Sequence, residues 1–147
     1  MDDEALKLEN QLCFPLYACA REIVRLYKPI LDELGLTYTQ YIAMLVLWER
    51  QRATVKELCE ALHLDSGTLT PLQKRLAAMG LITRRRDTAD ERSVIVELTE
   101  QGRALKERAR NVPARILQCV PLNLDDAATL YRLLYQLLGQ MERKEEA

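Results

Sequence analysis

The stretch DSGTLTPL at residues 65–72 decides how this chain folds. Its first three residues belong to a turn at residues 63–67, in which His63 is expected to be a turn residue rather than a ligand or base. Beyond it, apolar residues recur at helical spacing, at Leu69, Leu72, Leu76 and Met79. This pattern predicts a helix over about residues 68–79, ended by Gly80. The residues off the apolar stripe, which are expected to face outward, are Thr68, Thr70, Gln73 and Lys74.

The segments on either side of this helix predict a winged helix-turn-helix. Before it, Thr54 with Glu57 forms the pattern of a capping box and opens a short helix over residues 55–62. After it, residues 81–86 and 93–98 favour strands, and the polar linker between them predicts a β-hairpin. Two short helices followed by a hairpin give a DNA-binding part at about residues 54–98.

Long helices are expected at both ends of one domain that spans residues 1–147. The first runs over about residues 10–34, with its start near Leu12, Pro15 in the first turn, and a kink or break at Pro29. A buried helix follows over residues 39–50. Thr99 caps a helix to about residue 112, which residues 113–119 could continue, and Pro121 precedes a last helix over about 125–142. The fold class is therefore mainly α with a small β-hairpin.

The terminal helices, about residues 10–34 and 113–143, carry apolar stripes that need partners. A homodimer supplies them, and its twofold symmetry suits a palindromic operator in double-stranded DNA. The alternative is that the two helices pack on each other within one monomer.

Composition narrows the classes of function. The chain has 147 residues, 48% of them apolar, and a net charge of −1, so nucleic-acid binding requires a local basic patch. Neither a membrane span nor a signal peptide is expected, since the apolar runs are short and the N-terminus is acidic. The spacing of the four cysteines and the single histidine indicate no metal site, and no cofactor is expected. A reducing cytoplasm is the expected compartment.

The predicted recognition helix and hairpin supply the candidate DNA contacts. Ser66, Thr68, Thr70 and Gln73 could reach base edges, with Gln73 able to pair with adenine, and Lys74 and Arg75 could hold phosphates. The hairpin adds Arg84, Arg85, Arg86 and Arg92 for the backbone or the minor groove. The alternative is a solvated basic face on a scaffold that has lost DNA binding.

Several motifs over most of the chain resemble the MarR family of winged-helix regulators, and most closely its organic-hydroperoxide-sensing branch. They are LENQLCF (8–14), LYKP (26–29), LTYTQY (36–41), LVLWE (45–49), LDSGTLTPL (64–72) and DER (90–92). The cysteine segment and the recognition helix are quite specific, whereas DER indicates only the broad family.

The resemblance implies a homodimeric repressor that leaves DNA when an organic hydroperoxide oxidises Cys13. Cys13 matches the reactive cysteine, Tyr27 and Tyr38 match the phenols that hydrogen-bond it, and Cys119 matches the resolving cysteine of a two-cysteine subgroup. In that subgroup the two thiols form a disulfide between subunits. Asp90 and Arg92 match the pair in the wing, with Arg92 entering the minor groove.

The chain departs from the family pattern at Pro15, which could shift the helix start, and at Gln73, which could alter base preference. Cys19 and Cys59 are extra and leave another resolving partner open, although both are expected to be small buried residues. Tyr41 is expected in the core.

Helix geometry sets one further condition. Tyr27 lies 14 residues beyond Cys13, about 21 Å along a straight helix, so any contact between them must join two subunits. Tyr17, four residues after Cys13, can lie over it in the same chain. Cys13 in the first helical turn would gain from the helix macrodipole, which favours the reactive thiolate.

Two other functions remain open from the sequence. One is a MarR-type regulator that responds to a small aromatic ligand, or a global virulence or stress regulator, in which the cysteines are incidental. The other is a thiol peroxidase, which the missing thioredoxin-like strand pattern disfavours, so an enzyme is not expected.

Overall fold

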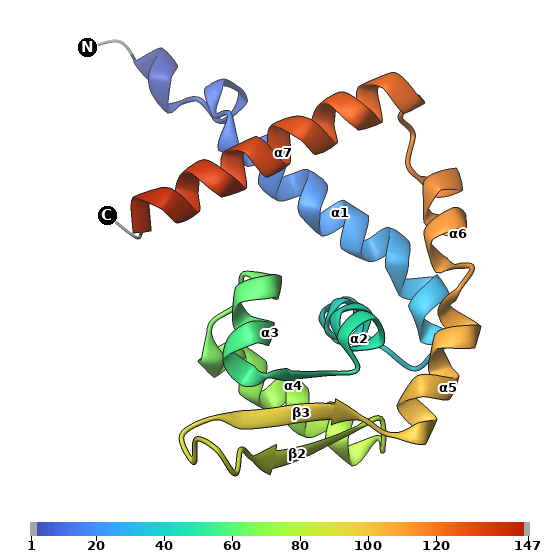
Figure 1. The fold of residues 1–147 in the computed structure, drawn as a ribbon. Coiled ribbons are helices and arrows are strands. Elements are labelled where there is room, and N and C mark those ends of the chain that lie inside the picture. Colours follow the sequence, from blue (N-terminus) through green and yellow to red (C-terminus); the bar gives the residue numbers. More distant parts are fainter. Residues whose placement is uncertain (1–2, 146–147) are drawn as a thin grey trace. The chain divides into compact units, whose positions relative to one another are not determined.

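The computed structural model describes residues 3–145, so the first residues of the acidic N-terminus and the last two residues lie outside it. The chain forms two compact units, residues 1–116 and 117–147. In the first unit, two short 3-10 turns (η1, Asp3–Leu6; η2, Leu8–Asn10) precede the helix α1 (Cys13–Asp32), as Figure 1 shows.

Helix α1 begins where the sequence predicts, with Leu12 as N-cap and Pro15 in the first turn. The expected break at Pro29 is wrong, because the helix continues through this residue to Asp32. Pro29 lies in the last turn, where the loss of one backbone N–H removes a single hydrogen bond near the helix end. Gly35, at φ 70°, then lets the chain turn into the next helix.

Helix α2 (Tyr38–Arg50) is the buried centre of the first unit. A capping box fixes its start, since Gln40 N–H donates to Thr37 Oγ1 (3.3 Å) and Thr37 N–H donates to Gln40 Oε1 (3.0 Å). Met44 and Leu47 are fully buried, and Trp48 Nε1 donates to Gly102 O at 2.9 Å. The predicted helix over 39–50 is confirmed.

Helices α3 (Val55–Leu62) and α4 (Ser66–Ala78) form the helix-turn-helix. Thr54 and Glu57 make the predicted capping box, and His63 adopts the left-handed conformation (φ 53°) in the turn, as expected. Helix α4 begins two residues earlier than predicted. The Asp65 carboxylate accepts the Thr68 N–H at 2.7 Å, and this cap makes Ser66 and Gly67 the first turn of α4.

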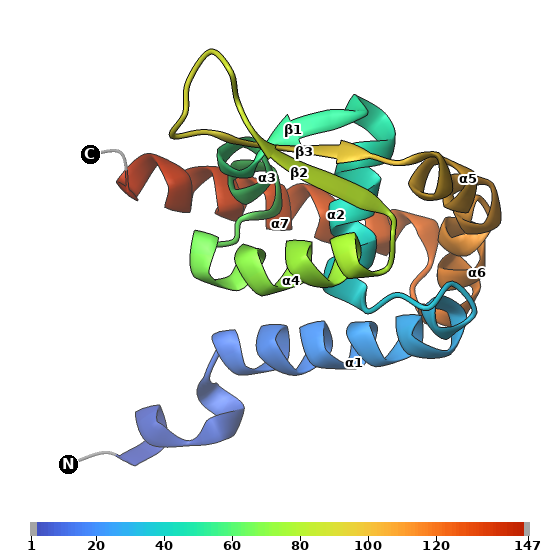
Figure 2. The ribbon, with the colours of Figure 1, turned by 90° about the horizontal axis from the view of Figure 1, so that it is seen from below.

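The sheet has three strands rather than a hairpin alone. Strands β2 (Ile82–Arg86) and β3 (Val94–Leu98) form the predicted hairpin, and the unpredicted β1 (Arg52–Thr54) pairs antiparallel with β3. The strand order is β1-β3-β2. Figure 2 shows α4 along one side of this sheet and the long loop of the hairpin projecting beyond it. The fold is a mainly α winged helix-turn-helix.

Helix α5 (Glu100–Ala109) ends three residues before the expected residue 112, and residues 113–119 belong to a separate helix, α6 (Val112–Cys119), rather than continuing α5. Thr99 caps α5 as predicted, because Gly102 N–H donates to its Oγ1 at 3.0 Å. The second unit contains α7 (Leu124–Glu145), which starts at an Asn123 cap and extends slightly beyond the predicted 125–142. None of the described residues of α7 is buried. Within residues 3–145, no helix has the length and hydropathy that a membrane crossing needs.

Candidate DNA interface and thiol site

Helix α4 presents most of the predicted contact residues to solvent. Ser66, Thr68, Lys74 and Arg75 are exposed, and Thr70 is half-buried with its hydroxyl donating to Ser66 O at 2.8 Å. The hydrogen bond from Thr68 N–H holds the pKa of the Asp65 carboxyl below its usual value. The start of α4, which would carry base contacts in a helix-turn-helix, is therefore capped by an ionised carboxylate at neutral pH.

Gln73 does not face outward, and this prediction is wrong. Its side chain is 1% exposed, and neither its amide nitrogen nor its amide oxygen has a hydrogen-bond partner among the described residues. The apolar stripe of α4 is wider than the spacing of leucines indicated, so Gln73 falls on its edge, next to the buried Leu72, Leu69 and Leu76. A side chain in this position cannot reach a base edge without moving.

The wing arginines divide between the two faces of the sheet. Arg84 pairs with Val96, which also pairs with Ala53, and both of these are buried, so Arg84 lies on the face toward the core and α4. Arg86, two residues on, shares that face. Arg85 pairs with Ile95 and lies on the opposite face, where it lines a polar hollow with Arg50 and Arg52. The three consecutive arginines therefore cannot act as one patch.

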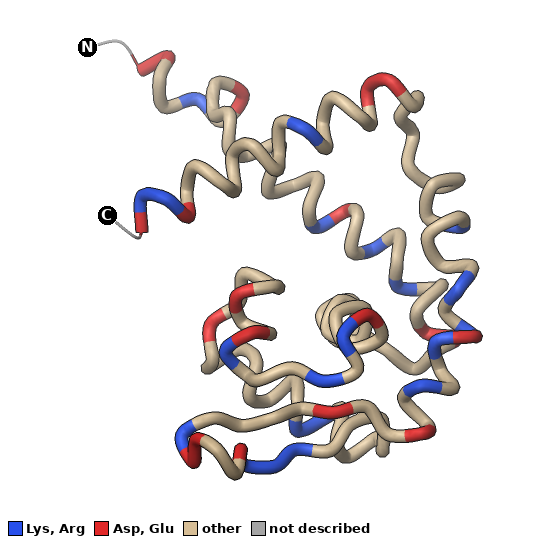
Figure 3. Tube along the Cα trace, viewed as in Figure 1, with Lys and Arg blue, Asp and Glu red and all other residues tan. Residues whose placement is uncertain are grey.

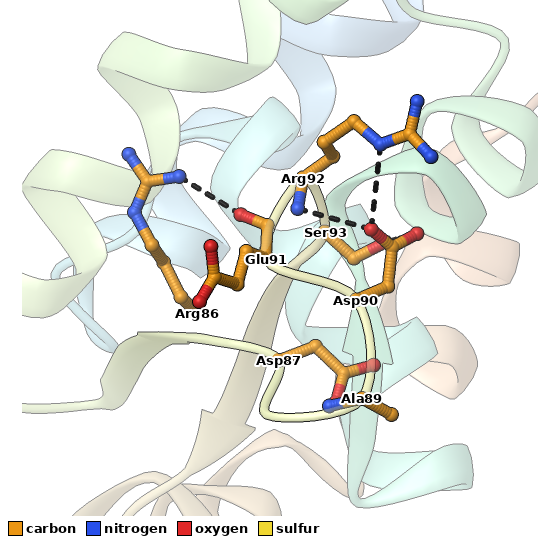
Figure 4. A network of polar contacts seen from close by, with 7 residues as sticks. All are labelled: Arg86, Asp87, Ala89, Asp90, Glu91, Arg92 and Ser93. Carbon is orange, nitrogen blue, oxygen red and sulfur yellow. Dashed lines mark hydrogen bonds and ion pairs between the residues drawn. The ribbon is translucent and has the colours of Figure 1, made fainter.

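The tip of the wing is held by its own polar contacts, as Figure 4 shows. Asp90 Oδ1 accepts the Arg92 N–H at 3.1 Å and lies 3.6 Å from Arg92 Nε. Arg86 donates to Glu91 O at 2.9 Å, and Asp87 Oδ1 accepts the Ala89 N–H at 3.0 Å. The Arg92 side chain remains 95% exposed. Asp90 therefore shapes the loop, and the exposed Arg92 side chain extends from the wing beside Asp90.

Because the net charge of the chain is −1, DNA binding depends on local groups of basic residues. Figure 3 shows basic residues along β2 and, mixed with acidic ones, at the tip of the wing. Sequence reasoning missed Lys56, in the first turn of α3, which lines a notch with Ser66, Arg84 and Arg92. Its place at the start of the first helix of the motif was the signal that could have identified it.

Of the residues predicted for the thiol site, Cys13 and Tyr17 lie near the start of α1 and Tyr27 lies toward its other end. Cys13 is the first residue of the helix and is exposed, and Tyr17, one turn later, is exposed beneath the Arg21 guanidinium, 5.6 Å from its ring centroid. Because α1 is unbroken from Cys13 to Asp32, Tyr27 is remote from the Cys13 of its own chain.

Three phenols gather near the other end of α1. The ring centroids of Tyr27 and Tyr38 are 4.8 Å apart, and those of Tyr27 and Tyr41 are 5.8 Å apart. Burial, with the neighbouring Tyr38 and Tyr41, raises the pKa of Tyr27 to about 12. Tyr27 is therefore a neutral hydrogen-bond donor at physiological pH. Tyr41 is 3% exposed, so its predicted place in the core is confirmed.

The remaining cysteines differ in exposure. Cys119, the last residue of α6, and Cys19 are exposed free thiols, so the expected burial of Cys19 is wrong for the single chain. Cys59 is half-buried, and burial raises the pKa of its thiol. Cys13 and Cys119 lie in different units. Across residues 3–145 no cluster of three potential metal ligands occurs.

Comparison with known proteins finds similarity to transcriptional regulators. A family described as "Transcriptional regulator SarA/Rot" matches residues 25–109. The organic hydroperoxide resistance transcriptional regulator of Bacillus subtilis is 52% identical over 95% of this chain and 95% of its own length.

The similar solved structures include AbfR of Staphylococcus epidermidis in several forms. Reduced AbfR bound to DNA is 35% identical, with a TM-score of 0.76 over 96% of this chain and 99% of that one. AbfR in a disulfide form is 34% identical, with a TM-score of 0.66 over 95% of each chain.

Proposed function

Since this chain belongs to the MarR family of winged-helix transcriptional regulators, in the branch of the organic hydroperoxide regulators, we propose that it is a redox-sensing repressor. In this proposal the reduced homodimer binds operator DNA, and oxidation of Cys13 by an organic hydroperoxide releases it. The observation that carries the proposal is the placement of an exposed thiol and a phenol cluster at opposite ends of the unbroken helix α1.

Operator binding is supported by α4 and the wing. The exposed Ser66 and Thr68 stand at the start of α4, and Arg92 extends from the wing tip. In a helix-turn-helix dimer the two recognition helices enter major grooves one turn apart, about 34 Å, so the operator is palindromic. A role on DNA places the protein in the cytoplasm.

Homodimer formation is supported by the apolar side chains that the single chain leaves exposed. On α1 these are Phe14, Leu16, Ile23 and Val24, and on α7 they include Leu130, Leu133, Leu137 and Met141. The apolar area on such helices requires a partner in water. A twofold axis beside α1 would bring Cys13 of one subunit to Tyr27 and Tyr38 of the other, which one chain cannot do.

The chemistry begins at the Cys13 thiolate, which attacks one oxygen of the hydroperoxide. An S–O bond forms, the O–O bond breaks, and the other fragment leaves as an alkoxide that takes up a proton to become an alcohol. Cys13 is thereby oxidised to a sulfenic acid. The neutral phenol of Tyr27 from the partner subunit donates a hydrogen bond to the thiolate and orients the peroxide.

A disulfide with Cys119 would complete the switch. The Cys119 thiol attacks the sulfenic sulfur and releases water, which requires the two Cα atoms to lie within about 7 Å. Forms of AbfR include an overoxidized protein bound to DNA and a disulfide-linked protein. This favours the disulfide, rather than an oxidised Cys13 alone, as the form of this protein that leaves DNA.

The direct test is the fluorescence anisotropy of labelled upstream DNA with reduced protein, before and after stoichiometric cumene hydroperoxide. We expect tight binding that is lost on oxidation and restored by dithiothreitol, and a Cys13→Ser variant that binds but ignores the oxidant. Tight binding by wild-type protein that is indifferent to oxidant would reject the redox function and leave the DNA-binding function intact.

A second candidate function is a response to a small aromatic ligand. It is favoured by one observation, an apolar hollow of about 390 Å³ lined by Tyr41, Leu45 and Trp48 with Lys106 and Arg110 at its edge. Cys13→Ser would leave a ligand response intact and abolish a peroxide response. The matched relatives are regulators rather than enzymes, which gives a peroxidase no support.

A further inference from the structure

A notch of about 510 Å³ separates α4 from the wing, and the start of α3 forms its third side. Its lining includes Lys56, Cys59, Thr70, Gln73, Arg84 and Arg92. Among the described lining residues the charged ones, Lys56, Arg84 and Arg92, are all basic. The notch therefore has the electrostatic character of a site for an anion.

Gln73 lines the notch, and its side-chain amide is buried without a partner. The residue is 1% exposed, and among the described residues neither polar atom of its side chain has a hydrogen-bond partner. A buried amide without a partner is destabilising, and buried polar groups in folded proteins are nearly always satisfied. An acceptor that enters the notch would satisfy the amide N–H₂ once the buried Gln73 side chain turns toward it.

The geometry of DNA supplies such an acceptor. In the proposed complex α4 enters a major groove and the wing the adjacent minor groove. One sugar–phosphate strand separates these two grooves, so it must cross the space between α4 and the wing, which is the notch. Phosphate oxygens accept hydrogen bonds and carry the negative charge that Lys56 and Arg84 match, whereas Arg92 is paired with Asp90 at the tip of the wing.

We propose that this notch binds one backbone phosphate of the operator, which is held by Lys56 and Arg84 and by a hydrogen bond from the Gln73 amide. The inference rests on the proposed function and deepens it. It gives Gln73 a role that does not depend on base sequence, in place of the pairing with adenine that the sequence predicts. Cys59, half-buried in the same notch, becomes a reporter of its occupancy.

The first test measures the affinity of Gln73→Leu for the operator and for an unrelated duplex of equal length, over a range of salt. We expect both affinities to fall by the same factor, about tenfold for a hydrogen bond to a charged group. The melting temperature should not fall, because leucine removes the unsatisfied amide. Lys56→Met should reduce the slope of log affinity against log salt by about one phosphate contact. Gln101→Leu, an exposed glutamine of α5, is the control.

Two results would overturn the proposal. Unchanged affinity for both duplexes would mean that the amide does not contact DNA, and a loss confined to the operator would make Gln73 a reader of bases. Failure of the wild-type protein to bind any DNA would instead reject the proposed function itself.

A second measurement tests the proposal with Gln73 intact, so it remains informative if the Gln73 variant folds poorly. In a protein with Cys13, Cys19 and Cys119 replaced by serine, N-ethylmaleimide labels Cys59 alone. We expect unrelated DNA to protect Cys59, and inorganic phosphate at matched ionic strength to protect it far less. Protection by inorganic phosphate but not by DNA would assign the notch to a free oxyanion and overturn the proposal, as would the absence of protection by either.

Discussion

Gly102 has no room for a side chain, and it connects three parts of the first unit. Its carbonyl accepts the Trp48 indole N–H, its N–H donates to Thr99 Oγ1, and Thr99 in turn donates to Gly80 O at 2.6 Å. A Cβ at this position would lie 2.2 Å from Leu81 O and 3.0 Å from Leu98 Cδ2. A single residue thus fixes how α5 leaves the sheet and meets α2.

We therefore expect Gly102→Ala to lower the free energy of unfolding by about 2–3 kcal/mol, as overpacking does at sites that cannot relax. Urea denaturation followed by circular dichroism measures the change. Gly67→Ala is the matched control, because its added Cβ would meet only Asp65 Oδ1 at 3.5 Å and the helix gains propensity. Equal stabilities for the two variants would refute the crowding inferred at Gly102.

Tyr27 makes a second prediction at this scale. Its pKa is raised to about 12 in the folded protein from the ordinary value of 10.0, so the folded state favours the neutral phenol. The associated stabilisation is present below pH 10.0 and is lost as the pH rises from there toward 12. Tyr27→Phe should show a smaller loss of unfolding free energy over that range, measured by denaturation at several pH values. Parallel profiles for both proteins would contradict it.

The starts of α1, α2 and α3 could be predicted from sequence. The short strand β1, and the features that depend on how elements pack together, could not. The Thr54/Glu57 capping box is entirely local, so α3 was placed correctly. Strand β1 has three residues and no pattern of its own, and it exists because Ala53 pairs with Val96 of β3. Gln73 is buried because of how α4 packs, and Arg85 lies on the opposite face of the sheet because of the strand register. Neither packing nor register can be read from a local stretch of sequence.

The capping box of α3 gives a prediction at the element scale. Thr54→Ala removes the hydroxyl that accepts the Glu57 N–H at 3.1 Å, and should lower the free energy of unfolding by about 1 kcal/mol. Because Thr54 is also the last residue of β1 and lines the notch, the DNA affinity should fall together with the free energy of unfolding. Thr54→Ser keeps the acceptor and should restore most of both quantities. If the serine variant is as unstable as the alanine one, the cap is not the cause.

At the scale of the whole molecule, the function depends on the dimer. Cys13 and Tyr27 stand at opposite ends of one helix, and Cys119 belongs to a different compact unit from Cys13. The candidate residues could be named from sequence, but their assembly depends on a second chain. In the proposed function, chemistry at Cys13 is therefore coupled to α4 through both subunits of the dimer.

Mixed dimers test whether the phenol acts across the interface. In a heterodimer of one Cys13→Ser chain and one Tyr27→Phe chain, the remaining Cys13 faces an intact Tyr27 only if the contact joins subunits. We expect its rate of sulfenic acid formation to equal that of wild-type protein and to exceed that of the Tyr27→Phe homodimer. A rate equal to that of the Tyr27→Phe homodimer would place the contact within one chain or show that Tyr27 has no role.

The central claim is that oxidation of Cys13 releases operator DNA. It is tested most directly by titrating the DNA-bound protein with cumene hydroperoxide, with the oxidation state of Cys13 read by mass spectrometry and the bound fraction by anisotropy in the same samples. The account predicts that the bound fraction falls in step with the conversion of Cys13 to a disulfide. DNA that stays bound when every Cys13 is in a disulfide would contradict it.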